Sequence, residues 1–210
     1  MTEPGATSAN LKRSVVSHYE ARLREHGATA RGMDWKDEES QRLRFSVLCE
    51  VAELSGRSVY DVGAGAAHLC TYLQQEHSTA VYAGCDLSPE MIEAARRLHP
   101  DADIEVRDIL LDPPSHRYDL VVCSGAFHVK LAAADPEWRE YMYDVIRRMY
   151  AMCDVAIAFN LMTDQVDYRA EGLFYAHPGE IFDFCRNELS RYVTLRNDYP
   201  LYEFTTYVYR

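Results

Sequence analysis

The sequence predicts a single α/β domain built on a mostly parallel, doubly wound sheet. Two observations carry this prediction. Short apolar segments alternate with amphipathic segments of helical period between residues 57 and 160, and a glycine-rich turn follows the first apolar segment. Strands that alternate with helices are typical of parallel βαβ units. The chain then ends in two β-rich segments, which predict an antiparallel close to the sheet.

Length, composition and charge agree with one enzyme-sized domain. The chain has 210 residues, of which 48% are apolar and 26% charged, as in an ordinary globular protein. The formal net charge of -11 repels phosphate backbones and anionic lipids. We therefore expect a small-molecule partner rather than nucleic acid or a membrane, and a monomer or homodimer.

Cysteine and histidine usage predicts neither disulfides nor metal. The six cysteines form no C-x-x-C pair and lie mostly in apolar segments, which favours free buried thiols over a disulfide or zinc framework. The histidines show no metal-ligand spacing. The first ten residues lack the apolar core of a signal peptide, and no apolar run approaches the ~18 residues of a membrane span. A cytoplasmic location is expected.

The elements are predicted in order along the chain. Residues 1–9 are expected to lack regular structure, and helices are expected at 10–26, which Gly27 ends, and at 36–55. Strands follow near 57–62, 80–85, 103–107, 118–123 and 155–160, with helices near 66–76, 89–98, 136–152 and 178–189. The segments 191–197 and 201–209 predict the closing hairpin.

The glycine-rich turn D-V-G-A-G-A-A begins at Asp61, at the end of the first strand. Gly63, Ala64 and Gly65 let the backbone approach a ligand closely and leave helix N–H groups free. A nicotinamide loop would carry a further glycine where this chain has His68. Asp61 instead offers a carboxylate to an ammonium group. S-adenosylmethionine (SAM) carries such a group and a pyrophosphate does not, so the turn favours SAM over a dinucleotide.

Two further acids follow the next two strands. Asp86 is expected to accept both ribose hydroxyls, with Leu87 and Met91 packed on the adenine. Asp108 is expected to accept from the adenine amino group, beside Ile109. A helix cap is the alternative role for Asp86, and an exposed turn residue is the alternative for Asp108. Acids at three successive strand ends make coincidence less plausible, because these ends form one ligand crevice.

These motifs resemble those of the class I SAM-dependent methyltransferases over residues 40–210, with Ala67 where the family often has a third glycine. The resemblance implies a Rossmann-like fold with a seven-stranded mixed sheet of order 3-2-1-4-5-7-6, an antiparallel last strand and an N-terminal helical cap. Within a single domain, 1–35 would form the N-terminal helix and lid loop, and 36–210 the SAM-binding methyltransferase domain. Several segments, among them H-G-A-T-A-R-G-M-D-W, also resemble small bacterial methyltransferases with unassigned substrates.

The loop after the fourth strand would lie between cofactor and substrate in this family. We assign Ser124 and Gly125 to the cofactor and Phe127 to the substrate. Family members that methylate nucleobase or glutamine nitrogens have N/D-P-P-Y here, whereas this chain has S-G-A-F. His128 is the candidate general base, because a neutral imidazole titrates near working pH. The alternative is a packed histidine bonded to backbone.

The remaining candidates come from the fifth strand and from the loops. Asn160 would orient an acceptor group and, with His128 and Tyr175, forms the predicted catalytic set. Tyr168, Tyr175 and His177 could wall the substrate pocket, where aromatic faces would also stabilise the sulfonium by cation–π attraction. Arg31 could grip a carboxylate of cofactor or substrate. The predicted substrate-binding residues are, in full, Tyr19, Arg31, Trp35, Phe127, Tyr168 and His177.

The sequence thus predicts a SAM-dependent methyltransferase acting on an oxygen or nitrogen of a small metabolite, in secondary metabolism. One alternative keeps SAM but has its α-amino group close a ring and expel methylthioadenosine. Another is a catalytically silent SAM-binding module. The glycine spacing disfavours a dehydrogenase.

Overall fold

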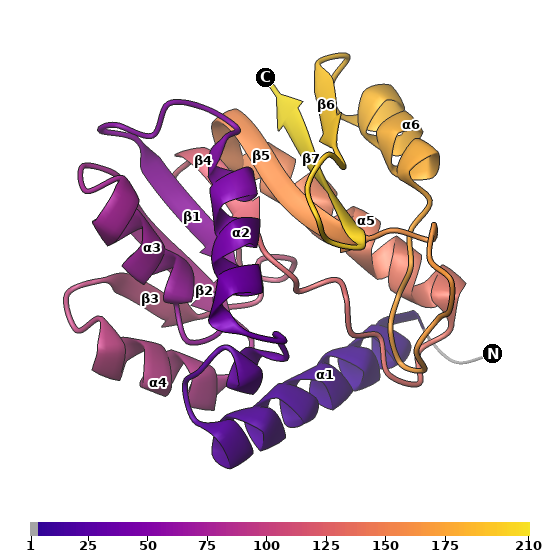
Figure 1. Ribbon diagram of the computed structural model, residues 1–210, viewed down its shortest axis with the longest axis horizontal. Coiled ribbons are helices and arrows are strands. Elements are labelled where there is room, and N and C mark those ends of the chain that lie inside the picture. The colour runs from indigo at the N-terminus through magenta and orange to yellow at the C-terminus, as the bar shows by residue number, and fades with distance from the viewer. Residues whose placement is uncertain (1–3) are drawn as a thin grey trace.

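A seven-stranded mixed sheet forms the centre of the protein in the computed structural model, which describes residues 4–210 (Figure 1). Its order, β3-β2-β1-β4-β5-β7-β6, confirms the prediction. The strands β1 to β5 are parallel, and β7 runs antiparallel to both β5 and β6. The strands are β1 Ser58–Val62, β2 Val81–Asp86, β3 Asp103–Val106, β4 Tyr118–Cys123, β5 Cys153–Met162, β6 Val193–Arg196 and β7 Glu203–Tyr209.

Helices cover both faces of this sheet. The helices of the described chain are α1 Pro4–His26, the short 3-10 helix η1 Arg31–Met33, α2 Glu38–Cys49, α3 His68–Glu76, α4 Pro89–Leu98, α5 Asp135–Met152 and α6 Pro178–Glu188. Apolar side chains of α2 and α3 pack on one face with Leu120 and Val122 of β4. Those of α5 and α6 pack on the other face with Val121. Successive side chains of β4 thus point to opposite faces of the sheet, because side-chain direction alternates along a strand with a period of two residues.

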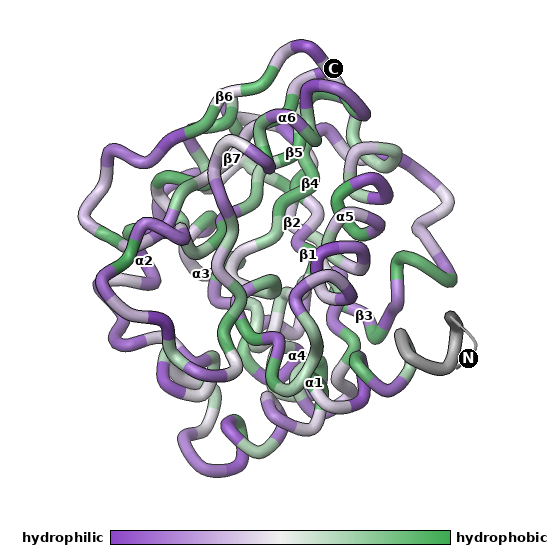
Figure 2. The backbone as a smooth tube through the Cα atoms, turned by 90° about the vertical axis from the view of Figure 1, so that its right-hand side faces the viewer, coloured by the Kyte–Doolittle hydropathy of each residue, from purple (hydrophilic) through white to green (hydrophobic). Residues whose placement is uncertain are grey.

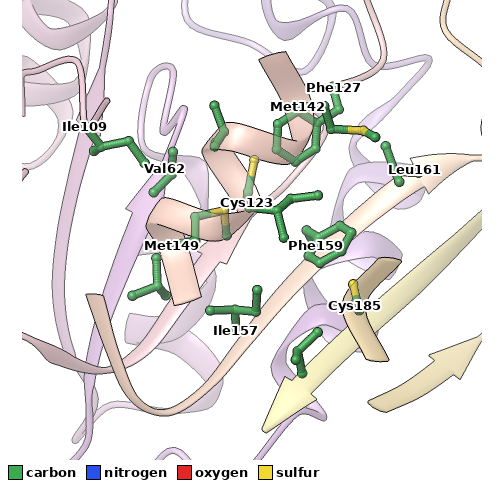
Figure 3. Packing of buried hydrophobic residues seen from close by; sticks show 14 of the residues in the cluster. Val62, Ile109, Cys123, Phe127, Met142, Met149, Ile157, Phe159, Leu161 and Cys185 are labelled. Atoms are coloured by element: carbon green, nitrogen blue, oxygen red, sulfur yellow. The ribbon is translucent and has the colours of Figure 1, made fainter. Parts of the chain in front are cut away.

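The larger core cluster lies between β4, β5 and α5. Met142 and Met149 of α5 meet Cys123, Ile157 and Phe159 of these two strands (Figure 3). Apolar segments gather along the central strands, with polar segments in the surrounding loops (Figure 2). All six cysteines are buried free thiols, in agreement with the expected reduced chain.

Two helix boundaries differ from those predicted. Helix α1 begins at Pro4 rather than at residue 10, because proline is tolerated in a first turn and the alanines that follow are good helix formers; residues 1–3 of the predicted irregular segment lie outside the described chain. Helix α2 begins one residue after Asp37, whose side chain caps it by accepting from the Ser40 N–H at 2.8 Å. It ends at Cys49, and Val51 and Leu54 of the predicted helix are buried in the turn before β1.

Helix α1 lies below the sheet as drawn in Figure 1, apart from the two helix layers. It contacts η1 and α4, and Arg24 forms an ion pair with Glu90 of α4. Residues 27–36, here called the strap, lead from α1 to α2 and contain η1. This path brings α1 and the strap over the carboxyl ends of β1 and β2, where a ligand site is expected.

Candidate functional site

The glycine-rich turn between β1 and α3 has positive φ values and close contacts that favour glycine over residues with a side chain. Gly63 and Gly65 have φ values of 73° and 55°. A Cβ atom on Gly63 would lie 2.8 Å from the Ala126 Cβ, and one on Gly65 would lie 2.7 Å from the Met33 Sδ. Ala67 caps α3 in the left-handed region with a φ of 57°, although a side chain disfavours it there. This is the position where the related family often has a glycine.

Asp86 holds the turn from the neighbouring strand. Its Oδ2 accepts from the Gly65 N–H at 2.9 Å, and its Oδ1 accepts from the Ser88 N–H at 2.8 Å. Burial raises the pKa of this carboxyl, whereas the backbone N–H groups lower it. Asp86 therefore joins the tips of β1 and β2 and still lines the cavity beside them.

Asp61, at the same edge, is 3% exposed and accepts from the Tyr82 hydroxyl at 2.9 Å. Burial raises its pKa to about 7, the Tyr82 hydrogen bond opposes the rise, and the charge of Asp86 adds to it. A cation beside Asp61 would favour its ionised form. Asp108, beyond β3, forms an ion pair with Lys12 of α1 at 2.6 Å.

These three acids line one cavity beneath α1 and the strap. The cavity wall contains every residue predicted to bind the cofactor: Asp61, Gly63, Ala64, Gly65, Asp86, Leu87, Met91, Asp108, Ile109, Ser124 and Gly125. Of the predicted substrate residues, it contains Tyr19, Trp35 and Phe127. The structure thus brings together residues from four successive strand ends.

The other predicted residues lie elsewhere. Tyr168 is 80% exposed, and Arg31 is exposed on the strap. The Tyr175 hydroxyl accepts from the Ala170 N–H at 3.0 Å, and His177 caps α6 by accepting from the Gly179 N–H at 3.1 Å. None of these four side chains lines the cavity in this conformation.

A buried network supports the loop after β4. The Asn160 Oδ1 accepts from the Gly125 N–H at 2.8 Å, and Glu203 accepts from the Asn160 Nδ2 at 2.7 Å. Arg44 pairs with Glu203 and stacks on the Trp35 ring at 4.3 Å. A Cβ atom on Gly125 would lie 2.2 Å from the edge of that ring. We call Trp35, Arg44, Gly125, Asn160 and Glu203 the Glu203 network.

His128 is not one of the residues that line the cavity. Its ring meets Trp35 edge-to-face, with centroids 5.7 Å apart. Burial lowers the pKa of His128, so its imidazole is neutral near pH 7. The buried Nε2 has no hydrogen-bond partner within residues 4–210. A neutral ring with a free nitrogen has the chemistry of a general base, and the Trp35 ring that it contacts lines the cavity although His128 itself does not.

Several cavity residues escaped the sequence analysis. Lys12 and Met33 lie beside the acids and the glycine turn. Gln41 donates to His68 at 3.0 Å, and His68 faces the Ala28 carbonyl at 3.2 Å. Lys12 lies on the helix predicted at 10–26, whose residues Leu11, Val15 and Val16 also line the cavity beside Tyr19. No sequence pattern indicates Met33, Gln41 or His68 as cavity residues.

Two further observations on the described residues concern metal binding and membrane spans. Within residues 4–210, no group of three or more His, Cys, Asp or Glu side chains is arranged to hold a metal ion. No helix of the described chain has the length and apolar character needed to cross a membrane.

Comparison with known proteins identifies the family. The family model described as "Methyltransferase domain" matches residues 59–150. The relative named "Putative methyltransferase Rv1506c", from Mycobacterium tuberculosis, is 33% identical over 153 residues, which are 72% of this chain and 92% of that protein.

Solved structures share the fold at low identity. Magnesium protoporphyrin IX methyltransferase of Synechocystis with bound S-adenosylhomocysteine (SAH) has a TM-score of 0.70 and 15% identity, covering 97% of this chain and 99% of that chain. The 1,6-didemethyltoxoflavin-N1-methyltransferase of Burkholderia thailandensis has a TM-score of 0.68 and 17% identity, with coverages of 100% and 91%. The chain therefore belongs to the class I SAM-dependent methyltransferases, and SAM is its cofactor.

Proposed function

We propose that this enzyme methylates an oxygen or nitrogen of a small molecule. The observation that carries the proposal is the single cavity lined by Asp61, Asp86 and Asp108 and covered by α1 and the strap. A covered cavity suits a small acceptor better than a polymer. The net charge of -11 also disfavours a nucleic acid. Related structures carry the names of enzymes acting on protoporphyrin, didemethyltoxoflavin and N-acetylserotonin.

The residues present fit the cofactor. We assign Asp61 to its ammonium group, Asp86 to its ribose hydroxyls and Asp108 to its adenine amino group. Two features support this assignment: within residues 4–210 the buried Asp61 carboxyl accepts a side-chain hydrogen bond only from the Tyr82 hydroxyl, and Gly63 leaves no room for a Cβ atom beside Ala126. When bound, SAM supplies an electrophilic methyl group on a sulfonium.

The chain contributes alignment and exclusion of water rather than covalent chemistry. We place the reacting end beside Ser124 and Gly125, because the three acids occupy the β1, β2 and β3 ends of the cavity. The Glu203 network fixes this loop through the Gly125 N–H. Trp35 and Phe127 would wall the acceptor. His128 would accept a proton from an acceptor hydroxyl or amine after a movement of its loop that brings Nε2 to the cavity.

Residues 1–35 would then act as a lid over the cavity, with 36–210 as the SAM-binding domain. Tyr168, Tyr175 and His177 would reach the acceptor only after the segment that carries them folds toward Trp35. The cytoplasmic location, the place in secondary metabolism and the choice between monomer and homodimer stay predictions of the sequence.

The test is a product assay. The enzyme is incubated with SAM and a panel of phenols, amines and carboxylic acids, with a protein mixture and RNA as further acceptors, and the nucleoside product is identified by mass spectrometry. Acceptor-dependent formation of SAH supports the proposal. Formation of methylthioadenosine would show cleavage on the other side of sulfur and would overturn it, as would SAH formation only with protein or nucleic-acid acceptors.

A further inference from the structure

The strap inserts a methionine side chain into the glycine-rich turn. The Ala66 N–H donates to the Met33 Sδ, with nitrogen and sulfur 3.4 Å apart. A Cβ atom on Gly65 would lie 2.7 Å from the same sulfur. Met33 lines the cavity together with Asp61 and Asp86. Its thioether therefore lies against the backbone of the turn at Gly65 and Ala66, in the wall of the cavity that the two acids also line.

The aminoacyl arm of the cofactor needs the space beside this turn. The arm is a methionine whose ammonium we assign to Asp61, so Met33 presents the same chain of methylenes and sulfur to the same turn. A thioether is a weak hydrogen-bond acceptor and a carboxylate a strong one. A carboxylate that reached the Ala66 N–H would make the better bond, but it cannot do so while the sulfur is in place.

Contacts within the strap and between the strap and α1 hold Met33 in position. The Met33 N–H donates to the Thr29 and Ala30 carbonyls at 3.2 and 3.1 Å. Its neighbour Asp34 takes a left-handed φ of 59° and pairs with Arg22 at 2.6 Å and with His18. The strap is thus fixed by backbone and ionic contacts that do not involve the cavity itself.

We propose that Met33 is a built-in competitor of SAM. In this conformation the Met33 side chain occupies the aminoacyl subsite, and the cofactor binds fully only after that side chain has moved out of it. The apparent affinity is then the intrinsic affinity multiplied by the fraction of molecules in which the Met33 side chain has left the subsite. The inference rests on the cofactor geometry of the proposed function. It predicts that ligands with an aminoacyl arm compete with Met33 and that nucleosides without one do not.

The experiment compares SAH and adenosine by isothermal titration calorimetry. Met33→Ala removes the competing side chain, and we expect its Kd for SAH to fall about three- to tenfold. The Kd for adenosine, which reaches only the ribose and adenine subsites, is expected to stay within about twofold. Met33→Leu keeps the bulk and serves as the matched control, with a Kd for SAH close to that of the wild type. Circular dichroism melting checks that each variant is folded.

Three outcomes would overturn the competitor while leaving the proposed function standing. They are an unchanged or higher Kd for SAH in Met33→Ala, an equal gain for adenosine, or a gain in Met33→Leu as large as that in the alanine variant. Failure of the wild-type enzyme to bind SAH at all would instead remove the assigned cofactor geometry. The two failures are therefore distinguishable.

Discussion

The Asn160 Nδ2 donates to Oε2 of Glu203 at 2.7 Å, while its Oδ1 accepts from the Gly125 N–H at 2.8 Å. The two side chains are only 2% and 5% exposed. One amide thus connects β7, the last strand of the chain, to the loop after β4 that faces the cavity. Arg44 of α2 completes the connection by pairing with Glu203 and stacking on Trp35.

Glu203→Gln tests how strongly this network holds the fold. The variant keeps the shape of the side chain but leaves the largely buried Arg44 cation without a counter-charge. We expect a loss of about 3 kcal/mol in the free energy of unfolding, measured with urea. Glu188→Gln is the control, because Glu188 pairs with Arg147 at 2.8 Å on the surface and its loss is expected to cost under about 1 kcal/mol. Equal effects of the two substitutions would contradict a structural role for the network.

The pKa of Asp61 predicts a pH dependence of SAM binding. With a pKa of about 7 in the free enzyme, Asp61 is increasingly protonated as the pH falls below 7 and cannot then pair with an ammonium group. The Kd for SAM should therefore rise toward tenfold per unit as the pH falls from 7 to 5, and binding there should release a proton from Asp61. Calorimetry in buffers of different ionisation enthalpy measures that proton.

The matched control is Asp61→Asn, which keeps the hydrogen bond from Tyr82 but has no proton to release. Its Kd should be higher at pH 8 and nearly flat between pH 5 and 7.5. A wild-type Kd that is independent of pH over this range would show that Asp61 does not contact the ammonium group.

The strands and the shared edge of the three acids could be predicted from local signals. Alternating apolar segments specify strands, and acids at or just past the ends of three parallel strands share one edge of the sheet. The strand order came instead from the resemblance to the class I methyltransferases. The sequence could not predict the Glu203 network, since Arg44, Asn160 and Glu203 are far apart in the chain and meet only through the pairing of β5 with β7. The insertion of Met33 depends likewise on the path of the strap, which no periodicity encodes.

Asp86→Ala tests the ribose assignment. We expect a loss of about 100-fold or more in SAM affinity, because each lost hydrogen bond to a charged group is worth about 1.5–3 kcal/mol. The structure adds an effect that the sequence did not predict: the same carboxylate accepts from the Gly65 and Ser88 N–H groups. A modest drop in melting temperature should therefore accompany the loss. Glu93→Ala, on the surface of α4, should change neither quantity, and unchanged SAM affinity in Asp86→Ala would remove the assignment.

Gly125→Ala separates backbone strain from contact with the strap. Gly125 has a φ of 78°, and an added Cβ atom would lie 2.2 and 2.4 Å from two carbons of the Trp35 ring. The ring must move, and with it the stacking on Arg44 and the cover of the cavity. The chain has two tryptophans, so in a Trp138→Phe background the fluorescence reports Trp35 alone. We expect its emission to shift to the red as the ring becomes exposed.

Gly56→Ala is the matched control for this substitution. Gly56 has a similar φ of 70° but nothing within 4 Å of the added Cβ atom. It should show only the conformational cost of about 1 kcal/mol in the free energy of unfolding, with unchanged Trp35 emission. Since both positions carry the same backbone strain, the difference between the variants measures the contact of Gly125 with Trp35. Identical emission in the two variants would mean that the strap does not rest on the loop after β4.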